Sequence, residues 1–308
     1  MKKENIVITI GDPAGCGPYI ALDAIKKLGP KFADFIVVGD GKIIEKIPLY
    51  HNIKNRITLI DPKTKGIEKV KNGYASFLSG AASLIYLKIA LDFMKENSIK
   101  RLVTAPLSKE AVKLNLPGFL GHTEYLASYF KRKIEMMMVS GKVKTVLFSR
   151  HIPLRDISSY IKKKNLVDTF SLVECELKKI FKIKSPKIAI ASLNPHAGLN
   201  TFLDKEERVI CAAIKEFGAK IIGPYPADTI FIGKNLKKYD CVICLYHDQA
   251  MTPFKLLSIK DGVNLTIGLP IIRTSPAHGV AYDIMREGKT PFSSSMIEAI
   301  KLAVRLNI

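Results

Sequence analysis

A chain of 308 residues, of which 47% are apolar, can bury the core of one large or two smaller α/β domains. Its formal net charge of +20 comes mostly from lysines scattered in small groups, without the aromatic-interleaved basic stripe of a nucleic-acid-binding surface. Five scattered cysteines argue against a disulfide framework, and no apolar run reaches the roughly 18 residues of a membrane span. We therefore expect a cytoplasmic enzyme with neither a nucleic-acid nor a membrane partner.

The first part of the chain alternates short apolar strands with amphipathic helices. The apolar run at 5–10 predicts a buried strand, and helical spacing at 18–28 ends at Gly29-Pro30. Further along, the predicted elements are strands at 35–38 and 57–60, a long amphipathic helix at 80–97, and a strand at 101–104. Strands that alternate with helices in this way are typical of an α/β fold with a mostly parallel sheet.

A second set of elements follows in the same style. It comprises strands at 136–139, 145–148, 187–191, 219–222 and 241–245, and helices at 165–181 and 293–306. No repeat, low-complexity tract or flexible linker separates the two sets. We therefore predict two closely joined domains, the first made of 1–130 with about 275–308 and the second of 131–274.

Several polar motifs begin where a predicted strand ends. Gly11 follows the first strand, and Thr104 ends the strand at 101–104. Asn194 and His247 follow two later strands in the same way. In open α/β sheets, ligands bind outside the carboxyl ends of the strands, so these loops are predicted to share one cleft.

Three of the six histidines, His151, His196 and His247, lie near strand ends beside polar groups that can orient an imidazole. Three neutral imidazoles at tetrahedral spacing leave one coordination position open, which is the arrangement of a catalytic divalent-cation site. The alternative is that each is a hydrogen-bonded structural histidine. Their long separations in sequence do not decide between the two.

Two other motifs give weaker signals. The turn GDPAGCG at 11–17 lies between a strand and a helix, where backbone amides can hold an anion, but it matches neither GxGxxG nor GxxxxGK[ST]. A tight, structurally required turn explains it at least as well. Cys241 and Cys244 have CxxC spacing inside an apolar run without a second pair, which favours a core strand over a zinc ribbon.

Polar residues elsewhere fit an anionic ligand. Arg273 lies between apolar residues and a Thr-Ser-Pro segment, and an arginine can grip a phosphate or carboxylate in a bidentate fork. Lys255 can add a point charge and Asn264 an orienting amide. His122 and Thr123 belong to the segment GHTE, which fits a ligand contact and equally a helix start.

Together these motifs resemble one family, the 4-hydroxythreonine-4-phosphate dehydrogenases of the vitamin B6 pathway. The matching segments are GDPAGCGP at 11–18, TAPLSK at 104–109, GHTEYL at 121–126, HIPLRD at 151–156, LNPHAG at 193–198, Glu206-Glu207, YHDQ at 246–249 and GVNLTIGLPIIRTSPAHG at 262–279. They extend from the first strand nearly to the last helix. The resemblance therefore covers essentially the whole chain.

This resemblance implies a role for most of the polar motif residues. One divalent cation per active site, Zn²⁺, Mg²⁺ or Co²⁺, would be ligated by His151, His196 and His247. Substrate contacts would come from His122, Thr123, Lys255, Asn264 and Arg273. The segment HGVAYDI at 278–284 is similar to the coenzyme loop of isocitrate and isopropylmalate dehydrogenases, which implies coenzyme contacts from His278, Gly279 and Asp283.

The resemblance also implies an architecture and a reaction. The expected fold is like that of isocitrate and isopropylmalate dehydrogenases, two α/β/α domains with a central cleft, in a homodimer whose active site lies at the subunit interface. The substrate, 4-phosphooxy-L-threonine, would lose a hydride from C3 to NAD or NADP, and the β-keto acid would then lose CO₂ to give 3-amino-2-oxopropyl phosphate. Asp248 and Lys109 are candidates, on chemical grounds alone, for the base that accepts the hydroxyl proton.

Two other functions are compatible with the sequence. A sister dehydrogenase of threonate or erythronate 4-phosphate would use the same metal and phosphate contacts and differ near the amine or the C2 hydroxyl. A basic protein that binds polyanions would account for the net charge of +20. Metal-dependent reduction of NAD would distinguish either dehydrogenase from the polyanion-binding protein.

Overall fold

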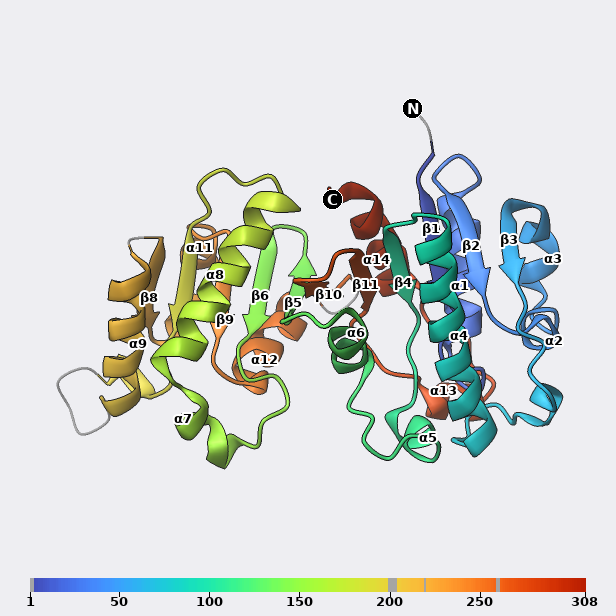
Figure 1. Ribbon diagram of the computed structural model, residues 1–308, viewed down its shortest axis with the longest axis horizontal. Coiled ribbons are helices and arrows are strands. Elements are labelled where there is room, and N and C mark those ends of the chain that lie inside the picture. The colour runs from blue at the N-terminus through green and yellow to red at the C-terminus, as the bar shows by residue number, and fades with distance from the viewer. Residues whose placement is uncertain (1–2, 199–203, 219, 259–260) are drawn as a thin grey trace. The chain divides into compact units, whose positions relative to one another are not determined.

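The computed structural model describes residues 3–198, 204–218, 220–258 and 261–308, which form two compact units (Figure 1). Unit 1 consists of Met1–Lys131, Leu269–Leu306 and Ile308, and unit 2 of Arg132–Gly268 and Asn307. The chain returns to unit 1 at Leu269, before position 275, so Arg273 belongs to unit 1.

Unit 1 is built on a parallel sheet whose inner strands are almost wholly buried. The strand order is β3 (Ile57–Ile60), β2 (Asp34–Val38), β1 (Asn5–Thr9), β4 (Arg101–Thr104) and β11 (Ile272–Pro276), and each neighbouring pair is parallel. Nearly continuous apolar sequences suit such strands because helices cover both faces of a parallel sheet. The chain runs outward from β1 to β3 and then returns to β4, so the direction of winding reverses between β1 and β4.

The helices of unit 1 pack on this sheet through their apolar faces. α4 (Phe77–Glu96) contacts β1 and β2, while α14 (Ser294–Arg305) contacts β4, β11 and α1 (Gly17–Leu28). Right-handed crossovers from β1 to β2 and from β3 to β4 run in opposite directions, which puts α1 and α4 on opposite faces. The shorter helices are α2 (Gly41–Ile44), α3 (Leu49–Ile53), α5 (Lys109–Lys113), α6 (His122–Phe130) and α13 (Tyr282–Arg286), with 3₁₀ turns at Lys54–Arg56 and Ile67–Lys69.

α4 is the one helix in the described part of the chain whose length and apolar composition would suit a membrane span. Lys88 and Asp92 interrupt its apolar residues, which is why no stretch of that length was expected from the sequence. Within unit 1, 50% of its most apolar window is buried, and Ser76 caps its first turn by accepting a hydrogen bond from the Ser79 amide at 3.0 Å. It therefore packs as a core helix of unit 1.

Unit 2 contains a mixed sheet. The strand order is β10 (Val263–Ile267), β5 (Glu135–Ser140), β6 (Val143–Leu147), β9 (Cys241–Cys244), β7 (Ile188–Ala191) and β8 (Ile221–Tyr225). β5 pairs antiparallel with both β10 and β6, whereas β6, β9, β7 and β8 form a parallel series. The parallel series brings the carboxyl ends of β6, β7 and β9 to the same edge of the sheet.

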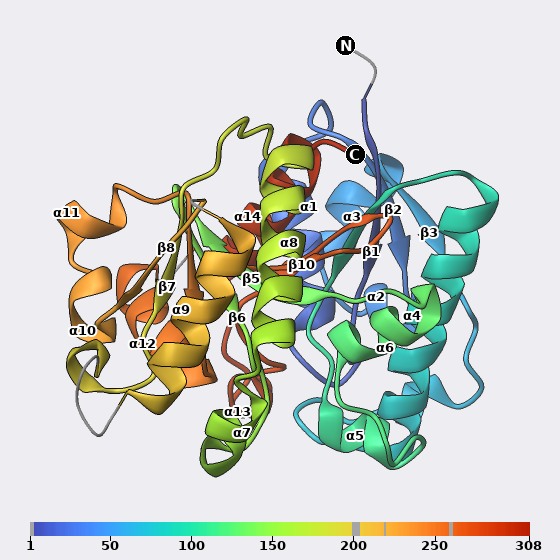
Figure 2. The same cartoon turned by 60° about the vertical axis from the view of Figure 1, so that its left-hand side comes forward.

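Two long helices of unit 2, α8 (Lys163–Lys179) and α9 (Lys205–Phe217), lie side by side (Figure 2). α12 (His247–Leu257) begins directly after β9 and packs against β6 and β9. The shorter helices are α7 (Ile157–Tyr160), α10 (Ala227–Ile230) and α11 (Gly233–Leu236), with 3₁₀ turns at Leu154–Asp156 and Pro195–Ala197. α12 therefore presents its N-terminal turn, which starts with His247, at the carboxyl edge of the sheet.

The predicted α/β fold is confirmed, and the predicted strands and long helices lie within a few residues of their expected positions. The strand expected at 219–222 is β8, and Ala219 lies outside the described residues. β10, β11, α9 and α12 were not expected, because their segments carry polar motifs that obscure the apolar pattern. Cys241 and Cys244 are buried in β9, and all five cysteines are free thiols, so the interpretation of CxxC as a core strand is confirmed.

Candidate active site

The turn at 11–17 lies where the winding of unit 1 reverses, and steric packing dictates its glycines. Gly11 has φ +69°, and a Cβ there would lie 2.1 Å from the Pro106 carbonyl oxygen. A Cβ on Gly17 would lie 2.1 Å from the carbonyl oxygen of Ile10. The Asp12 amide donates to the same Pro106 oxygen at 2.9 Å, which joins the loops after β1 and β4. A structurally required turn therefore explains this motif.

The loop that follows β11 is hydrogen-bonded to this turn. The Cys16 amide donates to the Val280 carbonyl at 2.9 Å, and the Tyr282 hydroxyl donates to the Asp12 carboxylate at 2.6 Å. Burial raises the pKa of Asp12, and the hydrogen bond from Tyr282 partly offsets this rise. Turn and loop thus form one continuous edge of unit 1.

The three residues expected to contact the coenzyme, His278, Gly279 and Asp283, are exposed in or just after this loop. His278 Nδ1 lies 2.9 Å from the Gly279 carbonyl oxygen, so the ring is held against its own backbone. Their exposure leaves them accessible to a ligand.

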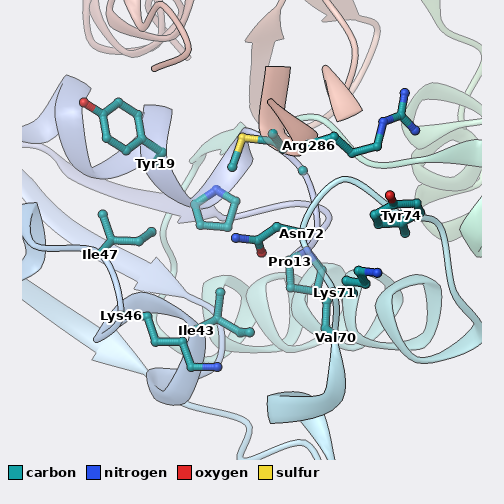
Figure 3. Close-up of a pocket in the computed structure, with 13 residues that line it drawn as sticks. Pro13, Tyr19, Ile43, Lys46, Ile47, Val70, Lys71, Asn72, Tyr74 and Arg286 are labelled. Carbon is teal, nitrogen blue, oxygen red and sulfur yellow. The ribbon is translucent and has the colours of Figure 1, made fainter. Parts of the chain in front are cut away.

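A cavity of about 560 Å³ lies beside the turn in unit 1 (Figure 3). Its walls include segments that follow β1, β2 and β3, at the carboxyl ends of these strands. Among the described residues that line it are three cations, Lys46, Lys71 and Arg286, and no carboxylate. The Lys71 ammonium lies 4.7 Å, and the Arg286 guanidinium 5.6 Å, from the centre of the Tyr74 ring. Clustered cations beside aromatic and apolar walls can bind a phosphate that is attached to an organic group.

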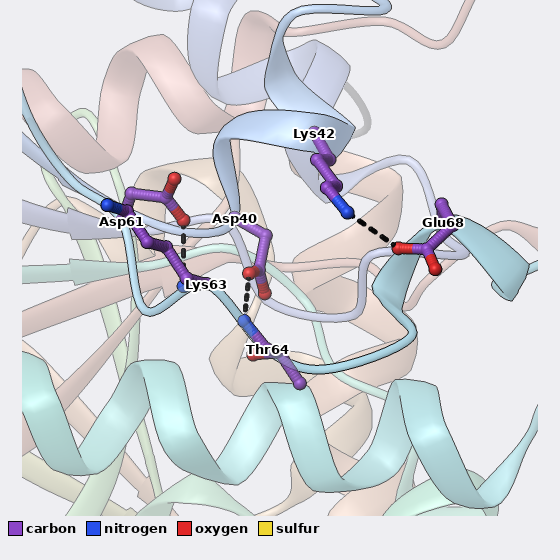
Figure 4. Close-up of polar contacts among 6 residues, drawn as sticks. All are labelled: Asp40, Lys42, Asp61, Lys63, Thr64 and Glu68. Atoms are coloured by element: carbon purple, nitrogen blue, oxygen red, sulfur yellow. Dashed lines mark hydrogen bonds and ion pairs between the residues drawn. The ribbon is translucent and has the colours of Figure 1, made fainter.

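The buried carboxylate of Asp40 lies at the start of α2, a helix that contributes to the lining of this cavity. Asp40 accepts hydrogen bonds from the Thr64 amide at 2.6 Å (Figure 4) and from the Tyr86 hydroxyl at 2.6 Å. It therefore ties the loops after β2 and β3 to α4. Asp40 immediately precedes α2, the helix that carries Ile43 into the lining, with Lys46 just beyond its end.

Arg273 supplies a buried cation next to the end of β4. Only 2% of its surface is exposed, and its Nε and Nη2 atoms lie 3.2 and 2.6 Å from Thr104 Oγ1. Burial lowers the pKa of Arg273 to about 10, and Glu124 opposes this shift. The guanidinium is still charged at neutral pH. A buried, oriented guanidinium at a strand end is suited to bind an anion.

His122 begins α6 and stays neutral near this cation. Burial lowers its pKa well below the usual value, and the charges of Arg273 and Lys109 lower it further. Thr123, the next residue, is only 4% exposed. We call Thr104, Lys109, His122, Thr123 and Arg273 the Arg273 group. At neutral pH the group offers two cations and an uncharged imidazole that can donate or accept a hydrogen bond.

The depressed pKa of His122 predicts a loss of stability in mild acid. Below about pH 6.5 the unfolded chain gains a proton that folded His122 resists. The free energy of unfolding therefore decreases as the pH falls, by up to about 1.4 kcal/mol per pH unit. His122→Asn should reduce the drop in melting temperature between about pH 7.5 and about pH 5.5. His51→Asn, at an exposed histidine on α3, is the control and should melt like the wild type at both values. If the melting temperature of the His122 variant drops as much as that of the wild type, His122 does not resist protonation in the folded protein.

In unit 2, His151 and His247 lie together after β6 and β9. Their ring centres are 6.3 Å apart with 29° between the ring planes, and both side chains are exposed. His247 Nδ1 is 2.6 Å from the carboxylate of Asp248. A carboxylate at this distance favours a proton on Nδ1 and leaves Nε2 with a lone pair for a metal or substrate.

His196 lies after β7 in a turn held by a buried glutamate. Glu207, which is 0% exposed, accepts hydrogen bonds from the amides of Leu193 at 2.9 Å and Asn194 at 2.8 Å. It also accepts from the Asn194 side chain at 2.8 Å. His196 itself has φ +57°, a conformation that side-chain-bearing residues seldom adopt. Glu207 therefore fixes the segment from which His196 projects.

Gln249 links the segments that carry His196 and His247. Its Oε1 atom accepts a hydrogen bond from the Leu245 amide at 2.7 Å, and its Nε2 atom donates to the Ser192 carbonyl at 2.7 Å. Ser192 follows β7 and Leu245 follows β9, and these strands are parallel neighbours. One buried carboxamide thus joins the two strand ends next to the histidines.

The histidines of unit 2 match a divalent cation in donor chemistry, although the described residues do not contain a preassembled cluster. No group of three or more His, Cys, Asp or Glu side chains in the described ranges is placed to hold a metal ion. His151 and His247 do face one another. Exposed imidazoles whose other nitrogen is hydrogen-bonded to a carboxylate are typical metal ligands. Two of the three predicted ligands are therefore brought together.

Asn264 and Lys255, the other predicted contacts in unit 2, lie on β10 and α12. The Asn264 Oδ1 atom is buried and has no hydrogen-bond partner among the described residues. Because an unpaired buried acceptor is costly, it is suited to receive a donor from a ligand. Lys255 is exposed near the end of α12.

Residues 31–303 match the family model described as pyridoxal phosphate biosynthetic protein PdxA. The chain belongs to the PdxA family. It is 37% identical to the 4-hydroxythreonine-4-phosphate dehydrogenase of Sulfurihydrogenibium sp., with 98% of each protein covered. It is 35% identical to the D-threonate 4-phosphate dehydrogenase of Salmonella typhimurium, with 99% of this chain and 100% of that protein covered. The crystal structure of 4-hydroxythreonine-4-phosphate dehydrogenase from Klebsiella pneumoniae matches with a TM-score of 0.83 at 30% identity, covering 98% of both chains.

Membership of the PdxA family confirms the predicted family and the predicted class of oxidoreductase. A dehydrogenase of this family uses a nicotinamide cofactor.

Some residues that organise this PdxA-family site were not singled out from the sequence. Gln249, Glu207 and Asp12 each bind backbone or side-chain groups of a site loop from a buried position. Gln249 belongs to YHDQ and Glu207 to the Glu206-Glu207 pair, so the motifs contained them. A polar residue inside a motif and next to apolar neighbours was the available signal.

Proposed function

We propose that this PdxA-family chain oxidises 4-phosphooxy-L-threonine at C3 with NAD or NADP and that the product then loses CO₂. The hydride leaves C3 for the nicotinamide, and the hydroxyl proton goes to a base. Breakage of the C1–C2 bond then releases CO₂, a proton is added at C2, and 3-amino-2-oxopropyl phosphate is formed. Full-length relatives with the corresponding name support this proposal.

The observation that carries the proposal is the buried guanidinium of Arg273. Arg273 lies on β11 and is 2% exposed; its side chain is oriented by Thr104 at the end of β4 and is close enough to His122 to lower the pKa of that histidine. A dianionic phosphate is the ligand that best compensates a buried arginine with Lys109 nearby. Arg273 and Lys109 would bind the phosphate, while neutral His122 and Thr123 would donate hydrogen bonds to it. Lys255 and Asn264 are the remaining proposed substrate contacts.

A divalent cation, Zn²⁺, Mg²⁺ or Co²⁺, would be held by His151, His196 and His247. When bound, it would supply Lewis-acid stabilisation of negative charge on the substrate oxygen. His151 and His247 already face one another, and Glu207 and Gln249 hold the segment that leads to His196. Asp248 orients the His247 ring.

The contact between Asp248 and His247 affects which residue can accept the hydroxyl proton of the substrate. Since Asp248 is engaged with His247 at 2.6 Å, it is better suited to orient the ring than to accept a proton. Lys109, the other candidate, follows the loop after β4 and starts α5. Because Lys109 is a cation of the Arg273 group, we place it at the phosphate and Asp248 at the His247 ring, so neither of the two candidates is the base that accepts the hydroxyl proton.

The coenzyme would bind at the edge of unit 1 formed by the turn at 11–17 and the loop after β11. His278, Gly279 and Asp283 are exposed there, and the cavity beside them offers Lys46, Lys71 and Arg286 to the coenzyme phosphates. This chemistry fits both NAD and NADP, because both carry a pyrophosphate.

We further propose a cytoplasmic homodimer whose active site lies at the subunit interface. Unit 2 carries exposed leucines: Leu154, three residues after His151, is 69% exposed, and Leu256 and Leu257, at the C-terminal end of α12, are 75% and 51% exposed. Apolar surface beside a polar site is suited to contact a second subunit. Five free thiols suit a reducing compartment.

The test is reduction of the coenzyme by purified protein with 4-phosphooxy-L-threonine, with and without added divalent metal and with NAD or NADP. D-threonate 4-phosphate is the second substrate to assay, because a relative with that name is 35% identical over its full length. Metal-dependent turnover of phosphooxy-threonine with the higher kcat/KM supports our proposal. Turnover of only the threonate compound would replace it with the sister activity.

A further inference from the structure

The residue before His151 has a conformation that its own chemistry disfavours. Arg150 has φ +48°, in the left-handed region, where a Cβ meets the backbone. It lies in the loop that leaves β6, after a hydrogen bond from the Phe148 amide to the Cys244 carbonyl at 2.9 Å. Because the backbone of Arg150 sets the direction of the next residue, this conformation determines where the His151 ring projects.

Contacts of the Arg150 side chain hold that conformation in place. Its Nη1 atom donates to the Ile134 carbonyl at 2.6 Å and to the Glu135 carboxylate at 3.1 Å. Glu135 is the first residue of β5, and its side chain is only 5% exposed. The other carboxylate oxygen accepts a hydrogen bond from the Thr169 hydroxyl of α8 at 3.0 Å. Glu135 therefore has fixed partners from two elements and offers Arg150 a rigid anchor.

We propose that Glu135 and Arg150 are positioning residues that hold His151 opposite His247, so that both imidazoles are presented together to a divalent cation. This inference rests on the proposed metal site. The two histidine rings lie 6.3 Å apart, and His247 has its own carboxylate, Asp248. Arg150 and Glu135 give the loop of His151 a corresponding anchor. Glu135 belongs to none of the motifs by which the metal ligands were recognised, and Arg150 immediately precedes the segment HIPLRD.

A contribution to folding stability does not by itself explain the buried ion pair between Glu135 and Arg150. Burial raises the pKa of Glu135 to about 7, even though Arg150, Thr169 and Lys133 favour the charged form. A buried ion pair is commonly no more stable than an apolar pair of the same size, whereas it fixes geometry. A strained backbone held by such a pair is characteristic of a site whose geometry has a function.

The experiment measures Co²⁺ binding to the full-length protein by its visible absorption, together with the melting temperature without metal. Glu135→Gln keeps the shape of the side chain and removes its charge. Arg150→Gly permits the left-handed backbone and removes the anchor, so it should fold. The matched control is the exposed ion pair Lys163–Glu216 of unit 2, 2.7 Å apart, which joins α8 to α9. Lys163→Gln and Glu216→Gln remove this contact, and His151→Ala gives the value without the ligand.

We expect both test variants to bind Co²⁺ about 10- to 100-fold more weakly than the wild type, with an altered absorption spectrum and nearly unchanged melting without metal. The two control variants should bind within about twofold of the wild type. If His151→Ala weakens binding but the test variants match the wild type, the positioning role is wrong and the metal site stands. A loss that appears only in variants with lowered melting temperature also overturns it. If the wild type binds no better than His151→Ala, the metal site itself is refuted, and this inference with it.

Discussion

His196→Ala should lower metal-dependent turnover of the phosphorylated substrate by about 10³-fold or more. The reason is that His196 is a proposed ligand, and two remaining imidazoles bind a cation far less tightly than three. Glu207 holds the backbone before His196 through the Leu193 and Asn194 amides, so the variant should still fold. The measurement is kcat/KM for coenzyme reduction with increasing metal, combined with metal content after dialysis.

His51→Ala is the matched control for this experiment. His51 is exposed on α3 in unit 1 and belongs to none of the site motifs. Its variant should retain both metal content and turnover. A folded His196 variant with full metal-dependent activity would show that His196 is a structural histidine, and the three-histidine site would have to be abandoned.

Arg273→Lys should lower kcat/KM about 10- to 100-fold, mainly through a higher KM for the phosphorylated substrate. Lysine keeps the positive charge but loses the planar fork, both contacts to Thr104, and the geometry for two parallel hydrogen bonds to a phosphate. Only 2% of Arg273 is exposed, so water cannot bridge the gap that the shorter lysine leaves.

Arg273→Met separates charge from packing. Methionine fills a similar space without the buried positive charge, so the variant should still fold. The pKa of His122 should rise, because the charge of Arg273 is one of the causes that lower it. Arg56→Lys, at an exposed arginine, is the control for general effects of the exchange. Unchanged KM in both Arg273 variants would exclude this guanidinium from phosphate binding.

Local pattern was sufficient to predict most strands of this protein. β3 and β4 lie at the predicted positions, because short apolar runs bounded by polar residues are a local signal. β10 and β11 were missed, since two short strands within one segment of polar motifs show little periodicity. Their existence depends on pairing with β5 and β4, strands far away in sequence.

The residues proposed to bind ligands could be predicted from the sequence, whereas the buried residues that hold their loops in place could not. His151, His247 and Arg273 stand out because a histidine or arginine among small and polar residues is unusual. The bridge made by Gln249 was not predictable, because it depends on β7 and β9 being neighbours, and no periodicity encodes that pairing. The same holds for the contact between Glu135 and Arg150 across β5 and β6.

The division of unit 1 into two stretches of sequence has a consequence for synthesis on the ribosome. Residues 132–268, which form nearly all of unit 2, are made before β11 and α14 emerge. Until then the β11 side of β4 is unpaired within unit 1, and an open strand edge invites association with other chains. At that stage the ribosome has already made Thr104, Lys109 and His122, but it has not yet made Arg273. Arg273, the buried cation of the proposed phosphate site, thus lies on one of the last strands to be translated, so an unfinished chain lacks it.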